Sequence, residues 1–184
     1  MPVVVALLRG INVGGSHLVP MADLRALLAG LRLRNVQTHL QSGNALFESA
    51  EKDLTQLSAR IASALERKFA FRVDVLLRTR SDLEDVIANN PFARRKGLES
   101  AKLVVSFLPN ALEKAQRDEI AELKLGREEI QFGKYELYIY FPDGQGRSKL
   151  PVALDRILKK TATARNWNTV TKLLELAQGM EAHR

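Results

Sequence analysis

Two short apolar runs, Val3–Leu8 and Leu103–Leu108, constrain the fold more than any other feature of the sequence. Runs this short and rich in valine and leucine are typical of strands covered on both faces, whereas a membrane-spanning helix needs roughly 20 apolar residues. Each run is followed by alternating helix-like and strand-like patterns. We therefore expect each to form the central strand of its own sheet, one in each half of the chain.

The first half predicts a βαββαβ order. Leucines spaced three and four residues apart after Pro20 indicate an amphipathic helix, and Asp53 is a typical N-cap for a second one. The residues before Ser42-Gly43 alternate polar and apolar, as in one strand of a hairpin. This order defines a ferredoxin-like split unit over residues 1–80. Its expected strands are Val3–Leu8, Asn35–Gln41, Asn44–Glu48 and Arg72–Arg78.

The second half, residues 81–184, repeats the theme without a convincing residue-level repeat. A capping box at Ser81–Glu84 opens a connecting helix that ends at Asn90-Pro91. After the run at Leu103 we expect a helix, a hairpin across Gly133-Lys134, a helix opened by Pro151 and a last helix that begins near Thr163. The predicted fold class is α+β, with two ferredoxin-like βαββα(β) units whose antiparallel-rich mixed sheets pack together.

The basic residues are unevenly distributed along the chain. Among the 184 residues there are 28 basic and 21 acidic side chains, a net charge of +7. Residues 1–90 hold 11 basic and 9 acidic side chains, whereas residues 91–184 hold 17 and 12. From Arg147 to Lys172 there are seven basic residues and one acidic residue, Asp155. Solvated helix faces are the ordinary explanation of such a charge, and a surface that faces anions is the alternative.

The composition also excludes several kinds of site. With no cysteine, the chain has no disulfide framework, no thiolate zinc site and no cysteine nucleophile. The segment Met1–Arg9 lacks a basic leader with a small-residue cleavage site, so we interpret it as a strand. These observations predict a cytoplasmic protein without a membrane partner.

Four candidate ligand-binding residues lie in the first half. The loop from Arg9 to Gly15 follows a buried strand, and its glycines would let backbone N–H groups line a concave anion site. It matches neither common glycine-rich phosphate motif, so turning the chain is the alternative role. The segment from Ser42 to Asn44 is foremost a hairpin turn whose side chains could also donate hydrogen bonds to a ligand. The candidates are Arg9, Asn12, Ser42 and Asn44.

Six further candidates lie in the second half. The segment Gly144–Lys149 is a glycine-containing loop with two cations and a hydroxyl, which is the most phosphate-like pattern in the chain; an ordinary solvated loop is the alternative. A second group is expected in the first turns of the last helix, where free N–H groups attract anions. The candidates are Arg147, Ser148, Lys149, Arg165, Asn166 and Asn168.

Three aromatic residues have alternative roles. Trp167 shares an apolar stripe with Val170, which favours core packing over base stacking. Tyr138 and Tyr140 share one strand face, as in a nucleic-acid stacking platform, but a buried interface uses tyrosine equally well.

Conventional catalytic and metal-binding patterns are missing. His17, His39 and His183 do not have metal-ligand spacing, so no metal site is predicted, and no serine has the context of a nucleophile elbow. Any catalytic residue or cofactor stays unknown, as does the oligomeric state.

Five sequence blocks are spread in order over nearly the whole chain: Ala6–Gly15, Leu40–Asn44, Asn90–Phe92, Gly146–Leu150 and Thr163–Val170. They resemble the blocks of the domain-of-unknown-function 1697 family of bacterial proteins, and their spread makes the resemblance specific. The resemblance implies an α+β fold of two subdomains with ferredoxin-like units, and it implies no activity or catalytic residues.

The resulting hypothesis is that the protein binds a phosphate-bearing ligand, either a nucleotide or a nucleic acid, through its basic and Asn/Ser-rich loops. An enzyme that uses the same loops and an interaction module with an exposed tyrosine face are the alternatives. If there is one site, Arg9 and Asn12 should line the same concave surface as Arg147 and Arg165.

Overall fold

The computed structural model describes residues 1–182, which fold into two units. The first unit comprises Met1–Glu84 and the described residues from Lys172 onward, and the second comprises Asp85–Thr171. The limits between the units fall inside two helices, α3 (Arg80–Ala88) and α6 (Trp167–Ala182). The sequence interpretation placed the limit at residue 80 and kept the whole last helix with the second half.

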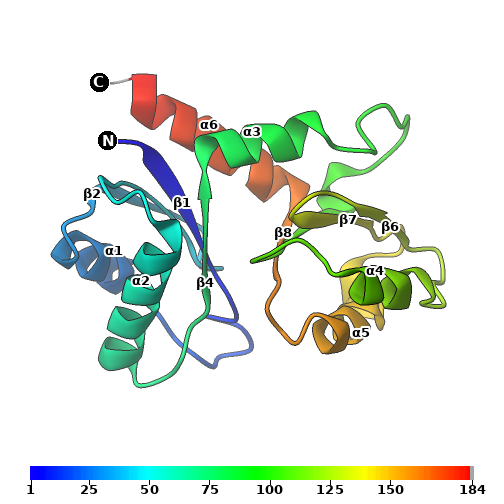
Figure 1. The fold of residues 1–184 in the computed structure, drawn as a ribbon, viewed down its shortest axis with the longest axis horizontal. Helices are drawn as coiled ribbons and strands as arrows, with labels where there is room; N and C mark the ends of the chain where they lie inside the picture. The colour runs from blue at the N-terminus through cyan, green and yellow to red at the C-terminus, as the bar shows by residue number, and fades with distance from the viewer. Residues whose placement is uncertain (183–184) are drawn as a thin grey trace. The chain divides into compact units, whose positions relative to one another are not determined.

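The first unit is built on a four-stranded antiparallel sheet (Figure 1). Its strand order is β2-β3-β1-β4, so the apolar run of β1 lies between two neighbours, as predicted. The order is that of a split βαββαβ unit, in which each helical connection skips one strand and adjacent strands run antiparallel. The strands are β1 (Val3–Leu8), β2 (Arg34–His39), β3 (Asn44–Glu48) and β4 (Val75–Thr79).

Two helices cover one face of this sheet, α1 (Met21–Gly30) and α2 (Leu54–Phe69). The Asp53 carboxylate accepts hydrogen bonds from the first-turn N–H groups of α2, which confirms the predicted cap. The leucines expected on one stripe of α1 pack into a core with alternate residues of β1 and with the apolar face of α2. Burial of this stripe therefore fixes both helices on the sheet.

The second unit has the same topology, with strand order β6-β7-β5-β8. It is a complete βαββαβ unit, because β8 (Thr163–Asn166) is a strand where the sequence predicted the start of a helix. The side chains of this strand alternate between buried and exposed, a period of two that a four-residue segment shows only weakly in sequence. The other elements are β5 (Leu103–Phe107), α4 (Lys114–Ala121), β6 (Glu129–Phe132), β7 (Glu136–Tyr140) and α5 (Leu150–Ile157), with short 3-10 turns at Ser100–Lys102 and Gln145–Arg147.

All strand pairs in the described residues are antiparallel, so the expectation of mixed sheets was wrong while the α+β class of two ferredoxin-like units is confirmed. The two units also match in register. At the end of each central strand, Leu8 or Leu108 donates its N–H to a carbonyl of the facing hairpin turn. Arg78 and Arg165 each lie in the last strand opposite a central-strand valine and donate to the preceding carbonyl. Whether the two sheets pack together stays a prediction.

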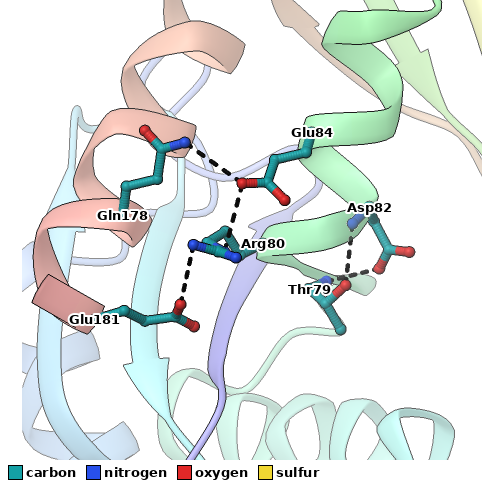
Figure 2. A network of polar contacts seen from close by, with 6 residues as sticks. All are labelled: Thr79, Arg80, Asp82, Glu84, Gln178 and Glu181. Atoms are coloured by element: carbon teal, nitrogen blue, oxygen red, sulfur yellow. Dashed lines mark hydrogen bonds and ion pairs between the residues drawn. The ribbon is translucent and has the colours of Figure 1, made fainter.

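A polar network joins the start of α3 to the end of α6 within the first unit (Figure 2). The N-cap of α3 is Thr79, which exchanges hydrogen bonds with Asp82, and not the predicted Ser81–Glu84 pair. Arg80 forms ion pairs with Glu84 at 3.6 Å and with Glu181 at 3.2 Å.

No helix in residues 1–182 combines the length and the apolar character needed to cross a bilayer.

Candidate anion-binding edge

One end of the second sheet gathers four chain segments. Strands β5 and β6 begin at this end, and β7 and β8 finish there, because all neighbours are antiparallel. Register fixes the arrangement: Tyr140 lies opposite both Leu103 and Glu129, and Asn166 lies opposite Val104. We call this end the basic edge and define it by residues 94–102, 127–129, 143–149 and 166–168.

Basic side chains outnumber acidic ones at the basic edge, and the acidic ones are already engaged. It has seven basic residues, Arg94, Arg95, Lys96, Lys102, Arg127, Arg147 and Lys149, against four acidic ones, Glu99, Glu128, Glu129 and Asp143. Three of the acids form ion pairs, Glu129 with Arg95 at 2.5 Å, Glu99 with Lys102 at 2.7 Å and Asp143 with Arg127 at 2.7 Å.

The fourth acid, Glu128, is held by the loop that carries the phosphate-like pattern. The Ser148 hydroxyl donates to the Glu128 carboxylate and accepts from the Leu150 N–H group. Its donation holds the pKa of Glu128 below the ordinary value. Ser148 therefore closes the loop, and its proton is engaged by Glu128; that it binds ligand stays a prediction.

Four cations at the basic edge remain unpaired. The side chains of Arg94, Lys96, Arg147 and Lys149 are exposed and form no ion pair or hydrogen bond with any residue from 1 to 182. Arg94 and Lys96 flank Arg95, whose guanidinium lies 5.1 Å from the centre of the Tyr140 ring and so anchors the loop to the sheet. These four side chains could meet an anion without breaking an existing ion pair.

The start of α6 contributes polar and aromatic side chains to the same edge. The side-chain amide oxygen Oδ1 of Asn166 accepts from the Thr169 N–H group at 2.8 Å, so the main role of this side chain is to cap α6. Asn168 is exposed in the first turn, where it can contact a ligand. Trp167 is half-buried and lies three residues before fully buried Val170 on the same face of α6, so its role in packing or in base stacking stays a prediction.

Arg165 is a strand residue and not a helix-start residue as predicted. It lies in β8 opposite Val105, is only 9% exposed and donates to the Ala164 carbonyl at 2.8 Å. Burial lowers its pKa to about 10. Its guanidinium belongs to the buried face of the sheet, so the basic edge does not include it.

Two of the first-half candidates have structural roles. The Asn12 amide donates to the Val19 carbonyl at 3.0 Å and to the Gln41 carbonyl at 2.7 Å, and its oxygen accepts from the Val19 N–H group at 2.8 Å. Asn44 is fully buried and donates to the His39 carbonyl. Both amides therefore fix the loops at this end of the first sheet, and their role as ligand-binding residues stays a prediction.

The other two first-half candidates lie beside these amides. Ser42 is exposed, and its hydroxyl accepts from the Asn44 amide at 3.2 Å. Arg9 is half-buried, and its N–H group donates to the Asp74 carbonyl. The structure thus gathers the four first-half candidates at one end of the first sheet. Their convergence with the second-half residues stays a prediction.

The tyrosine face of β7 is not a stacking platform. Tyr138 is 1% exposed and Tyr140 is 7% exposed. The Tyr138 hydroxyl donates to the Val86 carbonyl at 2.7 Å, and burial raises the pKa of this phenol. Both rings are packing residues of the second unit, so the alternative of an exposed tyrosine face is wrong and the buried role is the one observed.

Sequence reasoning missed the parts of the basic edge that come from distant loops. Arg94 and Lys96 belong to a basic triplet that is visible in sequence, but only the strand order places this triplet beside the loop that contains Arg147. The Asn90-Pro91-Phe92 block before this triplet is a sequence signal for the position of the loop, because the buried Phe92 ring lies 6.3 Å from the Tyr140 ring, centre to centre, and holds the loop.

Within residues 1–182, no three histidine or acidic side chains form a cluster that could hold a metal ion.

Comparisons with known proteins agree with the fold. A family model described as "Protein of unknown function (DUF1697)" matches residues 1–138, which leaves the resembling blocks at 146–150 and 163–170 outside the match. The solved structure of the conserved bacterial protein SP0830 from Streptococcus pneumoniae is similar, with a TM-score of 0.80 and 26% identity. The similarity covers 97% of this chain and 99% of that one. No curated protein is similar enough to match.

Proposed function

This chain belongs to the DUF1697 family of proteins of unknown function, and we propose that it binds a phosphate-bearing ligand, a nucleotide or a nucleic acid, at the basic edge. The observation that supports this proposal is the set of four cations without ion-pair partners, which lie beside acidic residues that already have partners. Arginine and lysine side chains are the usual protein ligands of phosphate oxygens. A ligand with several phosphates would meet several of these cations at once.

The positions of the four cations favour a polyanion over a single carboxylate. Arg147 and Lys149 lie on the loop after β7, whereas Arg94 and Lys96 lie on the loop that leads to β5. Cations from separate loops are matched best by charges spaced along a ligand. Asn168 adds an uncharged donor that can contact phosphate or sugar oxygens.

Salt dependence of binding tests the proposal. If four phosphates of a single strand are neutralised, the logarithm of affinity should fall with the logarithm of salt concentration with a slope of about −3, from about −0.7 per phosphate. In the double variant Arg147→Ala/Lys149→Ala the slope should shrink to about −1.4. A labelled single-stranded oligonucleotide and inorganic polyphosphate, titrated by fluorescence anisotropy at several salt concentrations, provide the measurement.

A matched control removes the same charge from the opposite end of the second sheet. Lys134 lies in the β6–β7 turn and Lys160 precedes β8, and both are exposed. The variant Lys134→Ala/Lys160→Asn lowers the net charge by the same amount, and asparagine tolerates the positive φ of 57° at position 160. Binding by this control should equal that of the wild type. Equal losses in both double variants, or no binding of either probe at low salt, would refute the proposal.

A further inference from the structure

Trp167 is the one tryptophan of the chain, and it begins α6 at the basic edge. It lies three residues before fully buried Val170, on the same face of the helix. The ring is nevertheless only half-buried. Trp167 is therefore an aromatic ring on a regular helix that still presents part of its surface to solvent.

The polar atom of this ring is also open. No buried side-chain nitrogen or oxygen in residues 1–182 lacks a hydrogen-bond partner. The Trp167 Nε1 atom has no such partner in these residues, so it reaches solvent. A tryptophan that serves packing alone usually buries its ring and satisfies its N–H group. This one keeps both a ring surface and a donor available.

The ring lies at the same end of the second sheet as the unpaired cations. Trp167 directly follows β8 at one edge of the strand order β6-β7-β5-β8, whereas the loop with Arg147 is bonded through Ser148 to Glu128, next to the start of β6 at the other edge. Three strand spacings, roughly 15 Å, separate these two edges. Asn168, the next residue along the helix, is exposed. An aromatic ring beside a cationic surface is the arrangement by which proteins bind single-stranded nucleic acids, stacking bases while cations follow the backbone.

We propose that the ligand of the basic edge is a single-stranded nucleic acid, with one base stacked on Trp167 and phosphates further along the strand on Arg147 and Lys149. This inference rests on the proposed function, because it takes the same cations as the phosphate contacts. A single strand fits better than a duplex, since a base must be unpaired to expose its face to the ring. Asn168 is placed to donate to the sugar or phosphate next to the stacked base.

Intrinsic fluorescence tests this inference directly, because Trp167 is the sole source of tryptophan emission. The full-length protein is titrated with a ten-nucleotide oligodeoxythymidylate, with an abasic oligonucleotide of equal length and with inorganic polyphosphate. All three should bind with the salt dependence expected of phosphate contacts. Only the base-bearing strand should quench the emission, and it should bind about 5- to 150-fold more tightly than the abasic strand.

Two variants separate stacking from stability. Trp167→Leu should lose the preference for the base-bearing strand, whereas Trp167→Phe should keep most of it because phenylalanine also stacks. Far-UV circular dichroism checks that each variant is folded. If Trp167→Leu does not fold, the affinities of Trp167→Phe for the two strands provide the test. Equal affinity for the abasic and base-bearing strands without quenching overturns the inference and leaves phosphate binding standing. Absence of binding by all three probes removes the proposed function as well. Quenching by free thymidine nucleotide with the same affinity as by the oligonucleotide would overturn the single strand in favour of a small ligand.

Discussion

The side chain of Asn12 should stabilise the first unit by joining three segments of chain. Its amide bonds Val19 through both the carbonyl and the N–H group, and it bonds the Gln41 carbonyl in the β2–β3 turn. Each such bond contributes about 0.5–1.5 kcal/mol, so the three together contribute about 1.5–4.5 kcal/mol. Asn12 has φ at 55°, a conformation that glycine adopts freely. Asn12→Gly removes all three bonds without backbone strain, so its free energy of unfolding should fall by this amount.

The charge variant Asn12→Asp sharpens the test. Its carboxylate keeps the acceptor for the Val19 N–H group but puts an anionic oxygen where the amide nitrogen lies, 2.7 Å from one carbonyl oxygen and 3.0 Å from another. We therefore expect Asn12→Asp to destabilise the protein at least as much as Asn12→Gly at neutral pH. Urea unfolding followed by far-UV circular dichroism gives the free energies, and hydrogen exchange at the Val19 amide gives the local effect. Wild-type stability and an unchanged Val19 exchange rate in Asn12→Asp would refute the reasoning.

Three further predictions concern both units. Tyr138→Phe removes the buried hydrogen bond to the Val86 carbonyl and should cost about 1–2 kcal/mol in urea unfolding, and a cost near zero would mean that this carbonyl has another partner. Gly43→Ala should cost about 2–4 kcal/mol in the same assay, because Gly43 has φ at 86° and its added Cβ would lie 2.9 Å from the Ile11 side chain. Glu128 has a lowered pKa in the folded protein, so its stabilising contribution is complete above the ordinary value of 4.5 and is lost as the pH falls through the folded value. Ser148→Ala should raise the Glu128 titration midpoint toward 4.5 in an NMR titration, and an unchanged midpoint would show that the hydroxyl is not the cause.

Most of the fold could be predicted from sequence because its central strands and helix stripes carry strong periodic signals. Val3–Leu8 is apolar at every position, and the cap at Asp53 has a local chemical cause. The strand Thr163–Asn166 could not be predicted in the same way. Its four residues include only one apolar side chain, and they form a strand because β5 offers them an unpaired edge. Tertiary pairing decides the conformation of such a segment.

The candidate site could be predicted only in part, because donors and acceptors in loops have no sequence signal for the partner they choose. Arg147 and Lys149 are exposed cations as expected, whereas Asn12 and Ser148 bond other loops of the chain. Whether a polar loop residue faces a ligand or a backbone carbonyl depends on which loops the sheet order brings together. That order links residues more than 30 positions apart, such as Arg95 and Glu129.

The discontinuous first unit has a consequence for synthesis on the ribosome. Its sheet is complete by Thr79, but its last helical segment begins at Lys172, after the whole second unit has been made. At about 5–20 residues per second, the intervening stretch of roughly 90 residues takes about 4–18 s to translate. During that interval the nascent first unit lacks the helical segment that supplies buried Leu173 and Ala177 and the Glu181 partner of Arg80. A chain released before residue 172 would contain the second unit but would lack the last helical segment of the first unit. Folding of the first unit should therefore depend on synthesis of the last turns of α6.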